Sequence, residues 1–340
     1  MHTGTTYTFS EVAYWTRWDI TVLLLLSAIP TAAYELLDWR WLAIPWLPVA
    51  LLGTAVSFVV GFKNNASYDR LWEARRVWGA IVNSSRTWGI MARDYVSEKH
   101  AREETPAARL DEERRVLFQR HFAWLTALRF QLREPRIWES MFNQKNAEYR
   151  NRWFTVDEQT STLGPALAAY LAPEEHARVM ACANKPAQIL ALQSSHLARL
   201  LRAGLIEDFR HMELQRVLAE LYAQQGASER IKNFPYPRQY ATLNLWFVRI
   251  FVVLIPLGML QEFHKLGGDL IWLSIPFSAL AGWIFTTMEK IGESSESPFE
   301  GSANDVPITA MSRAIEIDLR QMLGETKVPA PIQAQHYILT

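Results

Sequence analysis

The sequence predicts an all-α membrane protein with four transmembrane helices in two hairpins and a soluble helical domain between the hairpins. Three observations lead to this prediction. The chain contains four long apolar stretches, these stretches fall into two pairs joined by short links, and the segment 63–239 between the pairs shows helical periodicity without strand-like alternation. A bilayer core about 30 Å thick needs about 20 apolar residues in helical conformation, which sets the length expected of each span.

The first pair of apolar stretches comprises Ile20–Tyr34 and Trp41–Phe62. The second of them carries no charge over its whole length, whereas the first is shorter than a span requires. Trp15, Trp18 and Trp39 flank the first stretch, and indole rings favour the headgroup region of a bilayer. We therefore expect these tryptophans to anchor the ends of the first span.

The second pair comprises Tyr240–Leu260, interrupted only by Arg249, and Leu270–Met288. Any one stretch alone would also fit a buried helix of a soluble protein, but four stretches in two pairs favour a membrane protein. For Arg249 three interpretations stay open, namely a polar partner inside the bundle, a side chain that reaches the membrane surface, or a role in a pore.

The basic residues around the spans predict which side of the membrane the termini face. The links Glu35–Arg40 and Gln261–Asp269 carry one Lys or Arg each, whereas the opposite side is richer in them. The basic residues on that side are Lys63, Arg70, Arg75, Arg76, Arg230, Lys232, Arg238 and Lys290. The positive-inside rule then places both termini in the cytoplasm. The predicted division is 1–62 (spans 1 and 2), 63–239 (cytosolic domain), 240–288 (spans 3 and 4) and 289–340 (cytosolic C-terminal helix and tail).

The segment between the two hairpins predicts several helices. Lys63–Tyr95 contains no proline and continues directly from the second span, so we expect one long helix. Leu110–Arg133 has apolar residues close to the helical period, and Leu190–Gln225 predicts two helices broken near Gly204. A short amphipathic helix is expected at about Pro307–Leu323.

Composition and motifs exclude several classes of function. The chain has 35 basic and 35 acidic residues, and this balance gives no indication of a nucleic-acid partner. Cys182 is the only cysteine, which excludes an internal disulfide and a Cys-rich metal site, and we expect it to be a small buried side chain. The eight histidines form no i, i+4 pair, and no phosphate-binding glycine loop or dinucleotide motif occurs. We predict no metal, no cofactor and no enzymatic activity.

The predicted spans also lack the groups that active transport usually requires. Arg249 is the only ionisable residue inside them, so no carboxylate relay is available to couple a proton or ion gradient. The absence of a nucleotide motif removes coupling to ATP. These features favour passive flow, although a uniport carrier without charged residues would fit them as well.

The second span carries a stripe of residues that could line a pore. Thr54, Phe58 and Phe62 are spaced i, i+4 and i+8, which places them on one face of a helix. On a lone helix such a stripe would usually be core. If several copies pack around an axis, the phenyl rings would instead form an apolar constriction that gates by dewetting. Small residues that allow close helix packing are interleaved with the stripe, namely Gly53, Ala55, Ser57 and Gly61.

Three sequence patches resemble a known family. GFKNNASYDRLWEARRVWGAIVNSSR at 61–86, GASERIKNFPYPRQY at 226–240 and Ser-Pro-Phe at 297–299 are similar to the corresponding patches of bacterial bestrophin homologues. The order of elements agrees over about residues 10–310. The resemblance implies a homopentameric ion channel with one central pore in the bacterial inner (plasma) membrane, whose partners are its own copies, lipid and small permeant ions.

The resemblance also implies which residues narrow the pore. The neck falls on Thr54, Phe58 and Phe62, and Thr54 departs from a family pattern that is apolar at all three positions. A second, cytosolic aperture falls within LLRAGLIEDF, where we assign Ile206 and where an uncertainty of about one turn leaves Leu205 and Phe209 as alternatives.

The loop after the fourth span bears on regulation. Animal members of the family carry a dense acidic calcium clasp there, whereas SPFEGSANDVPI contains Glu300 and Asp305 as its only carboxylates. A hard cation needs several oxygen ligands. We therefore predict that calcium does not gate the channel through this loop.

The permeant ion is the least determined feature. Aromatic rings present a negative face and a positive edge, so the phenylalanine stripe can serve ions of either sign. We predict a preference for Na⁺ and K⁺, with a Cl⁻ channel of the same architecture as the alternative. A non-conducting membrane protein of assembly or binding, and a membrane enzyme, are the competing classes.

Overall fold

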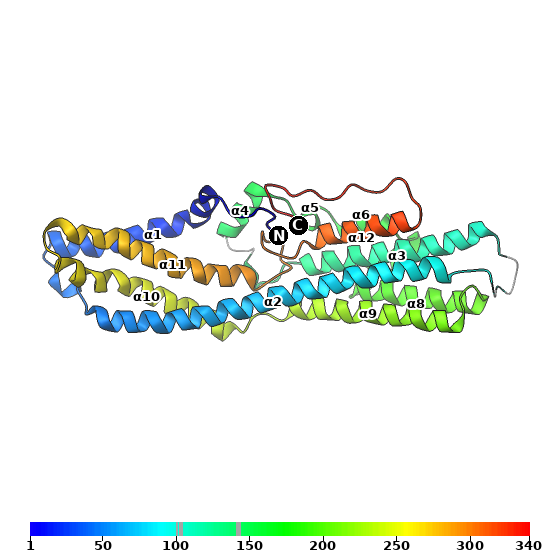
Figure 1. Ribbon diagram of the computed structural model, residues 1–340, viewed down its shortest axis with the longest axis horizontal. Coiled ribbons are helices and arrows are strands. Elements are labelled where there is room, and N and C mark those ends of the chain that lie inside the picture. Colours follow the sequence, from blue (N-terminus) through cyan, green and yellow to red (C-terminus); the bar gives the residue numbers. More distant parts are fainter. Residues whose placement is uncertain (100, 102–104, 141–143) are drawn as a thin grey trace. The chain divides into compact units, whose positions relative to one another are not determined.

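The computed structural model describes residues 1–99, 101, 105–140 and 144–340 (Figure 1). Four of its helices are long and apolar enough to cross a membrane, and the described residues contain no strand beyond isolated bridges. This arrangement confirms the all-α membrane fold. The elements are α1 Phe9–Leu36, η1 Arg40–Leu42, α2 Trp46–Tyr95, α3 Ala107–Arg133, α4 Gln144–Trp153, α5 Asp157–Thr160, α6 Leu163–Ala168, α7 Pro173–Met180, α8 Lys185–Ala203, α9 Asp208–Asn233, α10 Arg238–His264, η3 Gly268–Leu273, α11 Ser274–Ser295 and α12 Ile308–Met322.

The described chain divides into two compact units. The membrane unit consists of Gly4–Leu71 and Pro235–Ser297, and the helical unit consists of Met1–Thr3, Trp72–Phe234 and Pro298–Thr340. The C-terminal helix therefore belongs to the same unit as the middle of the chain. The four-segment division of the sequence, which follows the expected membrane surfaces, stays a prediction.

Helix α1 is longer than its apolar stretch indicated, because its first turns are polar and well capped. The Thr8 side chain accepts a hydrogen bond from the Glu11 amide, and the Glu11 carboxylate accepts one from the Thr8 amide. This reciprocal capping box satisfies two amides that a helix start would otherwise leave unpaired. The helix consequently begins at Phe9 and reaches 28 residues, enough to cross a bilayer.

Helix α2 runs without interruption over 50 residues, as the absence of an internal break predicted (Figure 1). Only its first part belongs to the membrane unit, since the unit border falls between Leu71 and Trp72. One helix thus contributes its uncharged sequence and its first charged residues to the membrane unit, and the rest of its charged sequence to the helical unit.

The membrane unit packs through β-branched side chains and small residues. Val56 and Val60 of α2 lie in one core cluster with Val252 and Ile255 of α10. At Gly53 an added Cβ would lie 2.6 Å from the Phe251 ring, so only glycine allows α2 to approach α10 this closely. In lipid, helices associate through such tight packing because burial from water no longer drives them together.

The helical unit has a core of large side chains from α2, α3, α8 and α9. Trp88, Trp124 and Leu197 are fully buried in it. As predicted, the helical stretch 190–225 breaks near Gly204, which adopts φ 73° and ends α8. Glycine adopts this left-handed conformation without the strain that a side chain would cause.

The tail and the first residues of the chain pair within the helical unit. The Thr3 amide donates to the Tyr337 carbonyl at 2.7 Å, the Leu339 amide donates to the Met1 carbonyl at 2.9 Å, and His2 and Ile338 form an antiparallel bridge.

Cys182, the sole cysteine, is partly exposed in the turn between α7 and α8 and donates its thiol proton to the Arg178 carbonyl at 3.3 Å. The expectation that this thiol is buried is therefore wrong.

Candidate functional site

The structure brings the three predicted neck residues onto one open face of α2. Phe58 and Phe62 are 65% and 72% exposed, and Thr54 is exposed as well. Val56, Val60 and Lys63, on the opposite side of the helix, are buried. No other described element of the chain covers the phenylalanine face, so the side chains are available to a pore, to lipid or to another copy.

Packing around Gly53 and Val60 determines which way this face points. Because these residues are buried against α10, the helix cannot rotate without losing the contacts described above. Gly61 lies on the open side, where an added Cβ would have no neighbouring atom within 4 Å. Of the predicted small residues, Gly53 therefore serves packing within the chain, whereas Gly61 remains open for packing between copies.

A buried ion pair fixes α2 directly after Phe62. The Lys63 ammonium lies 2.7 Å from the Glu289 carboxylate of α11, and both side chains are almost fully buried. The Asn64 amide donates to the Met288 carbonyl at 3.1 Å. A Cβ at Gly292 would lie 2.3 Å from Oδ1 of Asn64, so a larger residue there would displace the Asn64 side chain. These contacts tie the phenylalanine face to the rest of the membrane unit.

Further ion pairs join the same end of the membrane unit. Lys290 of α11 pairs with Asp19 of α1, and Arg238 of α10 pairs with Glu296. Together with Lys63, these are basic residues that the positive-inside rule used, and each of them has an acidic partner. These acidic partners do not change the predicted orientation, because the positive-inside rule counts Lys and Arg and acidic residues contribute little to it.

Unlike the neck residues, two of the three candidates for the predicted cytosolic aperture are buried. Ile206 and Leu205 are each 2% exposed, because the chain between α8 and α9 turns both side chains inwards. Phe209, in the first turn of α9, is 82% exposed. Of the three candidates, only Phe209 presents its side chain to the outside of its own chain.

Arg249 does not lie inside the bundle. Its side chain is exposed on α10, and its guanidinium lies 5.7 Å from the centre of the Trp246 ring. This position does not fit the interpretation that Arg249 pairs with a polar group in the bundle core, and the other two interpretations, a side chain at the membrane surface and a role in a pore, stay predictions.

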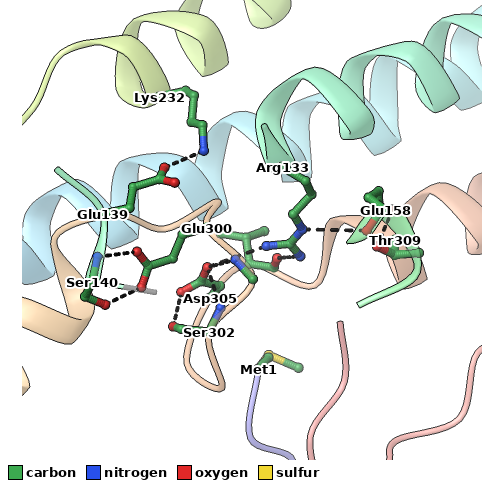
Figure 2. Close-up of polar contacts among 12 residues, drawn as sticks. Met1, Arg133, Glu139, Ser140, Glu158, Lys232, Glu300, Ser302, Asp305 and Thr309 are labelled. Carbon is green, nitrogen blue, oxygen red and sulfur yellow. Dashed lines mark hydrogen bonds and ion pairs between the residues drawn. The ribbon is translucent and has the colours of Figure 1, made fainter. Parts of the chain in front are cut away.

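The loop after α11 forms a second candidate site, within the helical unit (Figure 2). Glu300 accepts hydrogen bonds from the Ser140 amide at 2.9 Å and from the Ser140 hydroxyl. Asp305 accepts from the Gly301 amide at 2.7 Å and the Ser302 amide at 3.0 Å, and Ser302 also donates its hydroxyl. Both carboxylates are fully buried, and donors of the protein already surround their oxygens.

Arg133, at the end of α3, supplies the positive charge of this site. Its guanidinium lies 3.5 Å from Asp305 and 3.9 Å from Glu158. Figure 2 shows Arg133 between these two carboxylates. Burial raises the pKa of Asp305 above its ordinary value, against the opposing influence of Arg133. Burial acts on Glu158 in the same direction, but Arg133 and Arg129 outweigh it and hold the pKa of Glu158 below its ordinary value.

The residues of this loop do not fit a calcium ion. Hydrogen-bond donors and Arg133 occupy the neighbourhood of the two carboxylates, whereas Ca²⁺ needs six to eight oxygen ligands. The described part of the chain contains no group of three His, Cys, Asp or Glu side chains that could hold a metal. Arg133 could not be found from the sequence, because nothing near position 133 indicates a partner in the loop around position 305.

Fold and site together define a helical membrane protein whose second span exposes an aromatic stripe and continues as a long charged helix. The family model described as bacterial/fungal bestrophin protein matches residues 7–321. The chain therefore belongs to the bacterial and fungal bestrophin family, and its family and fold are those of ion channels.

Relatives and solved structures agree with this membership. The voltage-dependent anion channel-forming protein YneE of Escherichia coli (strain K12) is 30% identical over 86% of this chain and 82% of its own length. The voltage-dependent anion channel-forming protein RSc3414 of Ralstonia nicotianae is 29% identical over 86% of this chain and 82% of its own length. The crystal structure of a bacterial bestrophin homologue from Klebsiella pneumoniae matches with a TM-score of 0.74 at 23% identity, covering 92% of this chain and 99% of that one.

Proposed function

We propose that the protein forms a homopentamer in the bacterial plasma membrane and conducts small monovalent ions passively through a central pore lined by α2. The observation that carries the proposal is the apolar face of Phe58 and Phe62, which the chain holds away from its own core. The same side of α2 continues past the span into a charged sequence that needs water. If this face of α2 lines a water-filled axis shared by several copies, both its apolar part and its charged part have suitable surroundings. A face turned to lipid would suit only the apolar part.

The neck at Thr54, Phe58 and Phe62 gives a passing ion no ligands to replace its water. Ions cross when the side chains or the helices shift enough for water to enter, which is gating by dewetting. Thr54 has a hydroxyl that donates to the Ala50 carbonyl at 3.1 Å, so it adds little polarity to the neck.

We place the lower aperture at Phe209 in preference to Ile206. A residue that narrows a pore has to present its side chain to other copies, and Ile206 is buried within its own chain. A smaller side chain at position 209 should then admit larger ions, whereas the same change at position 206 should mainly disturb packing.

Calcium does not activate this channel through the loop after α11, because Arg133 already pairs with Asp305 and Ser140 already donates two hydrogen bonds to Glu300. Both termini and the helical unit face the cytoplasm in this proposal, as the distribution of basic residues predicts. The proposal favours Na⁺ and K⁺ over Cl⁻. Conduction of Cl⁻ through the same pore is the second candidate, favoured by the names of the relatives.

Ion flux from purified protein in liposomes tests the proposal. Phe58→Ala combined with Phe62→Ala should raise the flux, because smaller side chains admit water to the neck. A barrier lowered by about 1.4 kcal/mol corresponds to a tenfold increase. Phe277→Ala is the matched control, because Phe277 is also exposed in a span but lies on α11.

Two results would contradict the proposal. No flux from assembled native protein would favour a non-conducting assembly or binding protein. An unchanged flux in the assembled double variant would remove Phe58 and Phe62 from the pore.

A further inference from the structure

The exposed face of α2 continues beyond the neck, and Asp69 lies on it. Asp69 lies seven positions after Phe62 in the sequence, which is almost two turns of helix. At 100° and 1.5 Å per residue, the two side chains differ by about 20° around the helix axis and by about 10 Å along it. Asp69 is exposed, like Phe58 and Phe62. A face that turns Phe62 towards an axis therefore turns Asp69 towards the same axis.

In the part of the chain that the structure describes, no positive charge pairs with the Asp69 carboxylate. The positions one helical turn away are occupied by Asn65, Ala66, Trp72 and Glu73, none of which is basic. Among the residues that the structure describes, Asp69 makes no ion pair. By contrast, Lys63 is neutralised by Glu289, so it contributes no free positive charge beside the neck.

We propose that the Asp69 carboxylates of the assembled copies form a ring beneath the neck that concentrates cations and makes the channel selective for them. This inference rests on the proposed pore and names the residue that determines its ion selectivity. Charges of one sign around a narrow opening with low-dielectric walls raise the local concentration of counter-ions and exclude ions of the same sign. The ring acts on hydrated Na⁺ or K⁺ through its field, and no dehydrated site is needed.

Arg76 is the competing charge on the same face. It is exposed and lies a further seven residues along α2, about 21 Å from Phe62. At physiological ionic strength the field of a charge decays over about 8 Å. The carboxylates near the neck therefore outweigh the guanidinium groups where the pore is narrowest, and Arg76 has the smaller influence on selectivity.

Reversal potentials in asymmetric NaCl test the proposal on the full chain in planar bilayers. Asp69→Asn keeps the size of the side chain and removes its charge, so the permeability ratio of Na⁺ to Cl⁻ should fall roughly tenfold. Asp69→Lys should lower the ratio further. Asp111→Asn, which removes an exposed carboxylate from α3, should leave the ratio at the native value.

The possible outcomes separate this inference from the proposed function. If native protein conducts and the alanine changes at the neck raise its flux, but Asp69→Asn keeps the native ratio, the ring is overturned and the pore stands. If native protein passes no ions, the pore itself fails.

Two further measurements decide the case if Asp69→Asn does not assemble. Asn65→Asp adds a second carboxylate one turn closer to the neck and should raise the Na⁺ to Cl⁻ ratio. Raising NaCl from 0.1 M to 1 M shortens the screening length from about 10 Å to about 3 Å, so the cation preference of native protein should decline. A ratio that neither Asn65→Asp nor salt changes would overturn the proposal.

Discussion

The two halves of α2 differ in which side chains they bury in their cores. In the membrane unit, Phe58 and Phe62 are exposed and valines face the core, whereas in the helical unit Trp78 and Trp88 are fully buried. Water drives large apolar side chains into a core in proportion to the area they bury. Within lipid this force between helices is absent, so small and β-branched residues that pack closely take the core positions. In both halves one face of the helix is buried, but the buried residues are small or β-branched in the membrane unit and large and aromatic in the helical unit.

The largest effect should separate the two kinds of aromatic residue. Trp88→Ala should reduce the free energy of unfolding by about 4 kcal/mol, because it leaves a cavity in a packed core. Phe58→Ala should change it by less than about 1 kcal/mol, because the side chain is 65% exposed and its removal leaves no cavity in a packed core. Denaturant unfolding in detergent measures both. A comparable loss of stability in the two variants would show that the comparison between the halves is wrong.

A somewhat smaller effect is expected from the ion pair between Lys63 of α2 and Glu289 of α11. Lys63→Met leaves Glu289 buried without a partner and should destabilise the protein by about 3 kcal/mol. Lys265→Met is the control, because its pair with Glu262 is exposed and contributes at most about 1 kcal/mol. Combining Lys63→Met with Glu289→Leu should restore much of the stability. A double variant no more stable than the single one would rule out the uncompensated charge as the cause.

The smallest effect concerns His121, which lies beside Trp88 in the core of the helical unit. Neither of its ring nitrogens has a hydrogen-bond partner among the described residues, and burial lowers its pKa to about 3. Between pH 6.5 and 3 the unfolded chain binds a proton at this position that the folded chain does not, so stability falls as the pH falls. The slope is about 1.4 kcal/mol per pH unit.

His121→Leu should remove this slope. Between pH 8 and pH 5 the native protein should lose about 2 kcal/mol of its free energy of unfolding, and the variant should not lose this amount. Unfolding curves across this range provide the measurement. Phe118→Leu, a core change on the same helix without a titrating group, should alter stability by a similar amount at both pH values. If the two variants behave alike, His121 does not cause the acid sensitivity.

Features that follow the helix period could be predicted from the sequence. The spacing of Thr54, Phe58 and Phe62 places them on one face whatever surrounds them, and the structure leaves that face open. The long helix of the second span and the break at Gly204 follow from local preferences in the same way. Local periodicity was therefore sufficient to predict most of the fold and the position of the candidate neck.

Features that depend on distant partners could not be predicted. Ile206 lies in a connection without periodicity, so its burial depends on tertiary packing that spacing alone does not encode. Glu289, the partner of Lys63, and Asp305, one of the two partners of Arg133, lie more than a hundred residues away along the chain. A sequence shows that such charges exist, but only the folded chain shows which of them remain unneutralised.

The single thiol has a practical consequence for counting subunits. Cys182 is partly exposed and occurs once in each chain, so a fluorescent maleimide attaches one dye per copy without any engineered residue. The number of photobleaching steps from a single labelled particle then equals the number of chains in it. A natural reporter of stoichiometry is thereby built into the turn between α7 and α8.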